Sequence, residues 1–356
     1  MSAAPPTSLA ESLLRAPAGV ALLARLEVTQ RVDIPWLGWP SDCNLDAVRR
    51  AASSVWEMSY GALLEMAVSG AERLAGPWSG DALLSLPCLY EHAMHRRPIA
   101  EAVAERFHTA FHRDADFGAQ QWWYEAPSDS KHLATPCFTN YSNVYGNGEF
   151  TWDGLWTVTD PPPDVHDALI STWDFCGRPI SRWLLPVRVD ARVWDINEPE
   201  DWARLVETYP KVAARPHAGW ELPGPNQHPS DTKMLRSVTT QHAVRTEIAA
   251  HVLPDWEGVA ADFDGVHLSW AGFLTSEGYI NDLSDGGATM MRYWGSERTL
   301  WLHDVFEEPE PLAAPALTGR FGGGVGSDAS SDAERRASDR TALGRLLGRE
   351  GVRRTR

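Results

Sequence analysis

The chain has 356 residues, of which 43% are hydrophobic and 22% charged, close to an ordinary globular protein with a sizeable core. This composition excludes a wholly disordered or fibrous chain. The formal net charge of −16 argues against a nucleic-acid-binding surface on the main body. The unusual feature is the 17 Trp residues, against 8 Tyr and 10 Phe, and most of them lie between residues 116 and 306.

The positive charge is nearly all Arg, with only Lys131, Lys211 and Lys233, and together with abundant Ala, Gly and Pro this predicts a bacterial protein. The cysteines and the N-terminal residues predict a cytoplasmic location. The four Cys residues are widely spaced and no pair has metal-ligand spacing, which is typical of free thiols in a reducing compartment. The first residues contain no basic segment followed by an apolar stretch, so no signal peptide is expected. No window approaches the roughly 18 apolar residues of a membrane span, so no membrane partner is expected either.

Residues 1–115 are predicted to form a helical N-terminal domain. Ser8 is a good cap for a short helix, and Pro17 is typical of the first turn of the next one. Apolar residues at spacings of three and four predict one long helix over 44–74. One or two further helices are expected between residues 81 and 113.

Residues 116–306 are predicted to form an α+β domain with a mixed or antiparallel sheet. Short runs rich in Trp, Val, Thr and Phe alternate there with Gly, Pro, Asn and Asp. The expected strands are Gln121–Glu125, Leu155–Thr159, Trp183–Val189, Val193–Ile196, Gly265–Trp270 and Thr299–Asp304. The expected helices are Pro199–Tyr209 and Thr239–Val252.

Residues 307–356 have the composition of a linker followed by a disordered, Arg-rich tail. We expect this basic tail to be solvated. We expect no nucleic-acid partner except through this tail.

The common motifs of metal and nucleotide sites are missing from the sequence. The pairs His92/His95 and His108/His112 have helical spacing but lack the Glu of the HExxH zinc signature. No GxxxxGK[ST] phosphate loop and no GxSxG nucleophile elbow occur. We therefore predict no metal site.

Two segments combine polar and aromatic residues in a pattern suited to a cleft. In the strand Leu155–Thr159, alternation places Trp156 on one face and Thr157 and Thr159 on the other, where hydroxyls can line a polar cleft. In the second segment, a turn at Trp294-Gly295 leads into the strand that begins at Thr299. This places the carboxylate of Glu297 at the mouth of a strand.

These segments resemble a known group of proteins. The succession runs from the Gly-Leu-Trp-Thr-x-Thr strand through Val193–Trp202 and Asp255–Leu268 to Tyr293–Leu302. It resembles a family of actinobacterial proteins whose C-terminal layout is similar to the ADP-ribosyltransferase fold. The resemblance covers residues 120–306 and implies an NAD-consuming enzyme, a transferase or an NAD glycohydrolase, with a toxin or defence role among the possibilities.

The resemblance implies roles for individual residues. A Glu at the start of a late strand binds the nicotinamide ribose, and Glu297 matches it by position. In the family, a strand with Ser and Thr residues supports the dinucleotide, and Thr157 and Thr159 match these residues. An aromatic residue stacks on the nicotinamide, as Tyr141 or Trp156 would, with Trp294 as a further cleft residue.

The first strand departs from the pattern of the family. ADP-ribosyltransferases carry an Arg or His there to hold the phosphates or the ribose of NAD. The candidate first strand carries Tyr124-Glu125 instead, and His132 is the nearest substitute in sequence.

Two other functions are compatible with the sequence. A non-catalytic module of the same fold would bind a protein partner through the helical N-terminal domain. A glycan-binding or carbohydrate-active protein would use Trp rings for stacking and paired acids such as Asp262 and Asp264 for acid–base catalysis.

Overall fold

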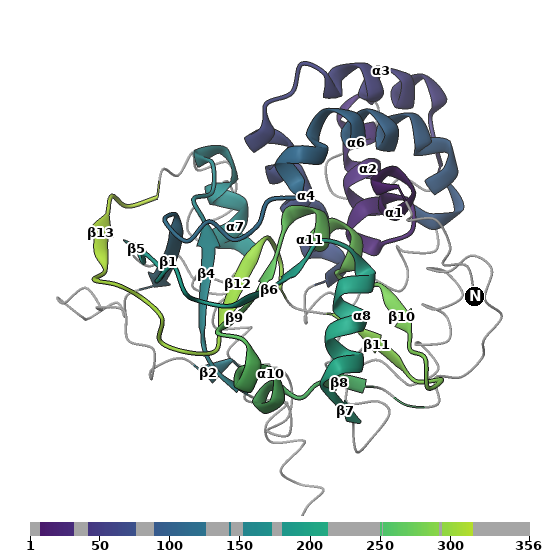
Figure 1. Ribbon diagram of the computed structural model, residues 1–356. Helices are drawn as coiled ribbons and strands as arrows, with labels where there is room; N and C mark the ends of the chain where they lie inside the picture. The colour runs from purple at the N-terminus through teal and green to yellow at the C-terminus, as the bar shows by residue number, and fades with distance from the viewer. Residues whose placement is uncertain are drawn as a thin grey trace, which may run out of the picture. The chain divides into compact units, whose positions relative to one another are not determined.

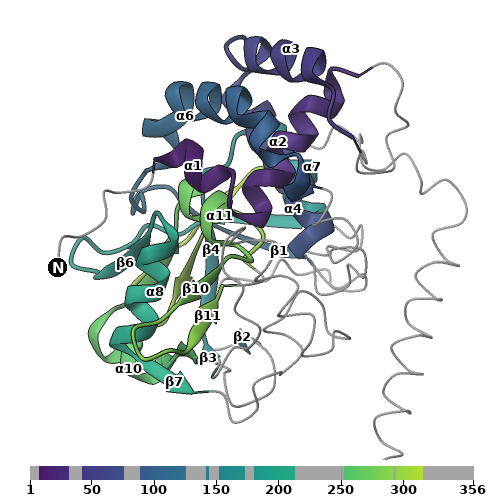
Figure 2. The ribbon, with the colours of Figure 1, turned by 90° about the vertical axis from the view of Figure 1, so that its right-hand side faces the viewer.

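A computed structural model describes residues 8–31, 42–75, 89–125, 142–143, 152–172, 180–212, 250, 252–291 and 294–315. All of these residues belong to one compact unit, Met1–Pro315. The fold is α+β, with helices followed along the chain by a mixed sheet (Figures 1 and 2). Residues 316–356 of the linker and tail expected over 307–356 lie outside the described residues, as do Tyr141 and His132.

The N-terminal part is helical, as predicted. Its described helices are α1 (Leu9–Leu13), α2 (Pro17–Thr29), α3 (Leu45–Val55), α4 (Tyr60–Ala75) and α6 (Arg97–Phe111), with a 3-10 turn at Ala93–Arg96. The expected cap is confirmed, because the Ser8 hydroxyl accepts from the Glu11 backbone N–H at 3.3 Å. Pro17 occupies the first turn of α2, also as expected.

The single helix predicted over 44–74 is wrong, because the chain breaks between α3 and α4. Trp56 caps α3, and its backbone N–H bonds to carbonyls three and two residues back. Ser59 then begins α4, since its hydroxyl accepts from the Ala62 backbone N–H at 3.1 Å. The apolar period continues across the break, which is why periodicity alone does not detect it.

The central sheet has seven strands in the order β13-β5-β1-β4-β12-β9-β6. All neighbours are antiparallel except β6 and β9, which are parallel, so the prediction of a mixed sheet is confirmed. Its strands are β1 (Gln120–Glu125), β4 (Leu155–Thr159), β5 (Ile180–Leu184), β6 (Val193–Ile196), β9 (Gly265–Leu268), β12 (Arg298–Trp301) and β13 (Glu310–Leu312). Two-stranded ladders join β2 (Ser142–Asn143) to β3 (Trp152–Asp153), β7 (Pro210–Val212) to β8 (Val252–Pro254), and β10 (Ile280–Asp282) to β11 (Ala288–Met290).

The strands β4 and β6 have the predicted bounds, whereas several other ends differ. The strand expected over Gly265–Trp270 ends at Leu268, because Ser269 caps a helix through the Gly272 backbone N–H at 3.1 Å. The strand expected over Trp183–Val189 is shifted to β5, with an isolated bridge at Val187. The strand expected over Thr299–Asp304 is β12, which ends at Trp301.

The helices of the second half are α7 (His166–Thr172), α8 (Pro199–Thr208), α10 (Trp256–Asp262) and α11 (Trp270–Ser276), with a 3-10 turn at Pro163–Val165. The prediction for α8 holds to within one residue, and a capping box of Glu198 and Asp201 begins it. The helices α7, α10 and α11 were not predicted. Most of the helix expected over Thr239–Val252 lies outside the described residues, and Val252 itself begins β8.

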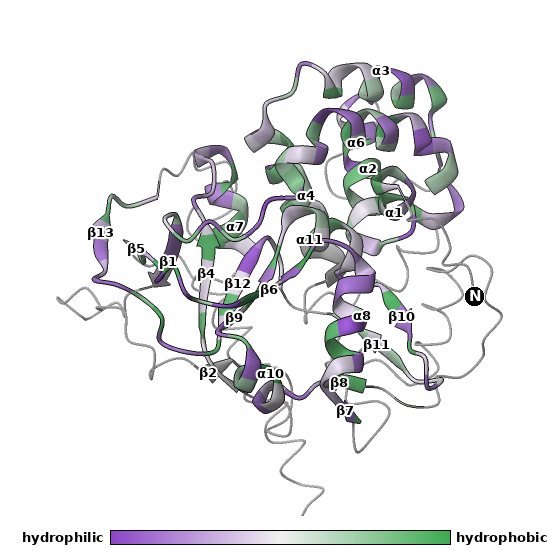
Figure 3. Cartoon of the chain, viewed as in Figure 1, coloured by the Kyte–Doolittle hydropathy of each residue, from purple (hydrophilic) through white to green (hydrophobic). Residues whose placement is uncertain are grey.

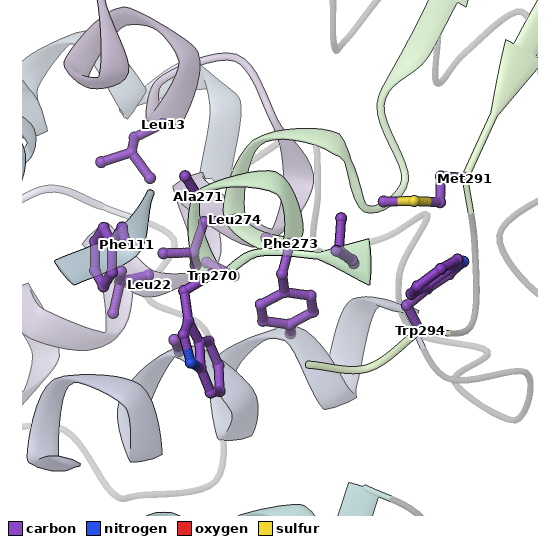
Figure 4. Close-up of a cluster of buried hydrophobic side chains, with 14 of the residues drawn as sticks. Leu13, Leu22, Phe111, Trp270, Ala271, Phe273, Leu274, Met291 and Trp294 are labelled. Carbon is purple, nitrogen blue, oxygen red and sulfur yellow. The ribbon is translucent and has the colours of Figure 1, made fainter. Parts of the chain in front are cut away.

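A continuous hydrophobic core joins the N-terminal helices to one face of the sheet. In Figure 4, Leu13, Leu22 and Phe111 from these helices gather around α11, which contributes Trp270 and Leu274. Figure 3 shows hydrophilic residues on the outer side of α3. The boundary expected near residue 116 separates the all-helical part from the part that contains the strands, and both parts contribute to this core.

A second, smaller core lies on the opposite face of the sheet. Its members include Trp122 of β1, Leu155 of β4 and Trp301 of β12. The sheet is therefore covered by the large core on one face, whereas the other face carries this small core next to polar residues.

The ordered chain extends beyond the boundary expected at residue 306. Within the segment predicted as linker, β13 pairs with β5 at the edge of the sheet, with Pro311 opposite Trp183. An edge strand accepts Pro because it lacks a neighbour on one side. In the parts of the chain that the structure describes, no helix is long and apolar enough to cross a membrane.

Candidate active site

Three acid–base side chains from distant parts of the chain meet on the face of the sheet opposite the large core. Asp195 lies on β6, His267 lies on β9, and Glu297 directly precedes β12. Asp195 pairs with His267 in the parallel ladder, which places both side chains on one face. We call Asp195, His267 and Glu297 the carboxylate–imidazole cluster.

His267 bridges the two carboxylates. Its Nδ1 lies 2.8 Å from Asp195 Oδ1, and its Nε2 lies 3.2 Å from Glu297 Oε1. The side chains of His267 and Glu297 are 2% and 4% exposed, whereas that of Asp195 is 31% exposed. The cluster thus runs from a partly solvated carboxylate through a buried imidazole to a buried carboxylate.

Thr159 holds the Glu297 carboxylate from the end of β4. Its hydroxyl donates to Glu297 Oε1 at 2.7 Å, and its backbone N–H donates to Oε2 at 3.1 Å. Gly295 adopts a φ of +74° two residues before Glu297, a conformation that favours Gly. The turn expected at Trp294-Gly295 therefore delivers Glu297 to the mouth of the strand.

A chain of hydrogen bonds ends on Glu297, and its direction is fixed. The Trp301 indole N–H, which only donates, donates to Thr157 Oγ1 at 2.8 Å. Thr157 then donates to Gln120 Oε1, and Gln120 Nε2 donates to Thr159 Oγ1 at 2.9 Å. The Thr159 hydroxyl in turn donates a hydrogen bond to Glu297 Oε1. Every donor points toward the carboxylate, an arrangement in which successive bonds strengthen one another.

Opposing effects act on the His267 pKa. Burial disfavours the charged ring and lowers the pKa, but hydrogen bonds to Asp195 and Glu297 outweigh burial and raise it to about 9. Nearby, burial raises the pKa of Tyr60, and the charge of Glu297 raises it further. The Tyr60 hydroxyl donates to the Ala110 carbonyl at 3.1 Å.

The structure brings three of the predicted site residues together, namely Thr157, Thr159 and Glu297. Trp156 and Trp294 lie instead in the large core on the opposite face, where their rings meet edge to face at 4.7 Å. Trp294 is 1% exposed. In Figure 4 it lies next to Met291 within the hydrophobic cluster.

The first strand provides amides where the resemblance implies a cation. Gln120 belongs to the hydrogen-bond chain, and Gln121 Oε1 accepts from Arg182 Nη2 at 2.8 Å. Arg182 lies on β5 opposite Trp123, with its guanidinium 4.9 Å from that ring. Because Trp123 alternates with Trp122 of the small core, this cation lies on the face away from Glu297.

Asp262 and Asp264, the acids named for the glycan alternative, are each engaged in a hydrogen bond within the chain. Asp262 accepts from the Tyr209 hydroxyl at 2.7 Å, while Asp264 accepts from the Arg192 backbone N–H at 2.7 Å. Among Trp side chains that the structure describes, only Trp56 is exposed. The described residues contain no group of three or more His, Cys, Asp or Glu placed to hold a metal ion.

His267 and Asp195 were not predicted as partners of Glu297. One signal was available: His267 stands in an otherwise apolar strand between Val266 and Leu268, where a buried polar side chain requires a partner. The matching carboxylate in Val193–Ile196 lies 72 residues away in sequence. Comparison of the chain with protein-family models, curated proteins and solved structures finds no match.

Proposed function

We propose that the chain is an NAD-consuming enzyme of the ADP-ribosyltransferase type, with Glu297 as its catalytic carboxylate. The supporting observation is the buried Glu297 carboxylate, oriented by Thr159 and His267 at the mouth of β12. A carboxylate preorganised in a site of low polarity stabilises positive charge that develops in a transition state.

The chemistry follows from this placement. The bond between ribose C1′ and the nicotinamide nitrogen breaks, and its electron pair leaves with neutral nicotinamide. Positive charge develops on the ribosyl group, next to the Glu297 carboxylate. A nucleophile then forms a bond to C1′ and loses its proton. The nucleophile is water in a glycohydrolase and an acceptor side chain in a transferase.

Glu297 retains capacity to accept from a substrate. Among the described residues, Oε2 accepts only from the Thr159 backbone N–H at 3.1 Å, whereas Oε1 accepts from Thr159 Oγ1 and lies 3.2 Å from His267 Nε2. A carboxylate oxygen has room for further donors. A ribose hydroxyl is the donor that this chemistry requires, and Oε2 is its acceptor.

The test is release of nicotinamide from NAD by the full chain. We expect turnover by the wild-type protein and a loss of at least about 100-fold in Glu297→Gln, in line with removal of one preorganised charge. Glu257→Gln, which changes an exposed acid on α10, is the matched control and retains activity. Absence of nicotinamide release by the folded wild-type protein, with water or with a panel of acceptor proteins, would refute the function.

A second candidate function is a non-catalytic module of the same fold. It is favoured by β1, where Gln120 is engaged in the hydrogen-bond chain and no cation lies on the Glu297 face of the described strand. On this hypothesis the helical part binds a protein partner, and the exposed Leu45, Trp56 and Met94 offer apolar contacts. A pull-down that retains the same partner after Glu297→Gln, with no NAD turnover in the wild type, would favour the module.

The cellular setting belongs to the same proposal. An NAD-consuming enzyme acts where NAD is abundant, which is consistent with the cytoplasmic location expected from the sequence. Such an activity suits a toxin or a defence protein. Growth of a bacterial host during induced expression of wild-type protein and of Glu297→Gln distinguishes a toxic activity from a harmless one.

A further inference from the structure

We propose that His267 is a positioning residue that, with both ring nitrogens protonated, bridges Asp195 and Glu297 and fixes the Glu297 carboxylate for reaction. The role in turnover rests on the proposed function. The protonation of His267 does not, and it is measurable in the absence of any substrate.

The first step concerns the number of protons on the ring. Both nitrogens of His267 lie within hydrogen-bond distance of a carboxylate oxygen, at 2.8 Å and 3.2 Å. A neutral imidazole has a single N–H, so its other nitrogen would turn a lone pair toward an oxygen that also has only lone pairs. The geometry therefore requires a proton between each nitrogen and its carboxylate.

The second step excludes Glu297 Oε1 as the source of that proton. Gln120 Nε2 also donates to the Asp116 carbonyl at 3.0 Å, which can only accept and so fixes the orientation of the Gln120 amide. Gln120 therefore donates to Thr159 Oγ1, and the Thr159 hydroxyl donates to Glu297 Oε1. Oε1 therefore acts as an acceptor toward both Thr159 and His267. The proton in the 3.2 Å contact belongs to His267 Nε2.

The third step gives the two oxygens of Glu297 different tasks. Oε1 accepts from Thr159 and His267 and serves as the anchor. Oε2 accepts only from the Thr159 backbone N–H among the described residues, and it is the oxygen left for a substrate. His267 thus determines which oxygen is presented.

The surroundings of His267 suit a cation. Asp195 faces it from β6 and Glu297 from the turn before β12, while Thr299, its partner on β12, is uncharged. Tyr60 on α4 interacts electrostatically with Glu297, whose charge raises the pKa of the Tyr60 hydroxyl. The His267 pKa of about 9 agrees with a charged ring at neutral pH. Asp195, the one partly exposed member, connects the cluster to solvent.

The first experiment is a pH titration of the histidine ring nitrogens by NMR on the full chain without substrate. The His267 signals are assigned by their loss in His267→Gln. We expect two protonated nitrogens at pH 7 and deprotonation near pH 9. His303, which is 47% exposed and lies 3.2 Å from Asp264, is the matched control for a histidine–carboxylate pair away from Glu297. A neutral His267 ring at pH 7 would overturn the inference.

The second experiment is the pH profile of kcat for nicotinamide release. In the wild type we expect activity to fall on the alkaline side with a midpoint near pH 9. Asp195→Asn removes the negative charge next to the His267 ring, so the midpoint of the variant's pH profile should fall by about 1 to 3 pH units. Asp264→Asn, the control, should leave the midpoint unchanged. An Asp195→Asn profile that coincides with the wild type contradicts the positioning role.

The two experiments separate the possible failures. A charged His267 at pH 7 in a protein without NAD turnover refutes the NAD-consuming function and retains the bridge. A neutral His267 in an active enzyme refutes the bridge and retains the function. If Asp195→Asn does not fold, the NMR titration of the wild type still decides the protonation.

Discussion

Replacement of Thr159 by Val removes one hydroxyl and leaves a side chain of nearly the same shape. That hydroxyl donates to Glu297 Oε1 at 2.7 Å and accepts from Gln120 Nε2 at 2.9 Å. A hydrogen bond to a charged group stabilises a protein by about 1.5 to 3 kcal/mol, and a neutral one by about 0.5 to 1.5 kcal/mol. Gln120 keeps its bond to the Asp116 carbonyl at 3.0 Å, so only one of its donors loses its acceptor.

We therefore expect Thr159→Val to lower the free energy of unfolding by about 2 to 4 kcal/mol. The matched control is Thr159→Ser, which keeps the hydroxyl and loses one methyl group, at a cost of about 1 kcal/mol. Urea unfolding at pH 7, followed by Trp fluorescence, measures both variants. A Val variant within about 0.5 kcal/mol of the Ser variant would refute the hydrogen-bond chain as a stabilising element.

Further predictions concern stability. The pKa of His267 is about 9 in the folded protein and 6.5 in the unfolded chain, so its stabilising effect is complete below pH 6.5 and is lost as the pH rises through 9. The wild type should lose about 3 kcal/mol over that interval, and urea unfolding of His267→Gln should show no such loss. Gly272→Ala should cost about 3 kcal/mol, because its Cβ would lie 2.1 Å from the Ile196 carbonyl oxygen. Gly286→Ala, strained by a φ of +88° but in open space, should cost only about 1 to 2 kcal/mol, and equal melting temperatures would contradict this contrast. Glu27→Gln breaks a fully buried ion pair with Arg96 and should cost about 3 to 5 kcal/mol in the same urea assay, and a cost below 1 kcal/mol would be inconsistent with the pair.

Local sequence signals predicted the elements whose ends carry strong turn or cap residues. Gly154 precedes β4, and Pro199 with its acidic neighbours begins α8, so both elements lie where they were expected. The helix break at Ser59 was missed because one Ser competes with a long apolar period. The helix α11 was missed because its apolar residues continue directly from a buried strand.

The site was predicted only where its residues share a local pattern. Alternation along β4 correctly placed Thr157 and Thr159 on the face opposite Trp156, and the expected turn at Gly295 lies directly before Glu297, which remains a predicted site residue. Asp195 and His267 are joined by a parallel ladder between segments far apart in sequence. No local pattern encodes that pairing, so the bridge becomes visible only in the fold.

The central claim is that the Glu297 side chain contacts the nicotinamide ribose of NAD. A crystal structure of Glu297→Gln soaked with NAD tests it directly, because this variant should bind NAD and not cleave it. We expect intact NAD with a ribose hydroxyl about 2.7 to 3.2 Å from the side chain at position 297. NAD bound elsewhere, or no NAD bound at saturating concentration, would contradict it.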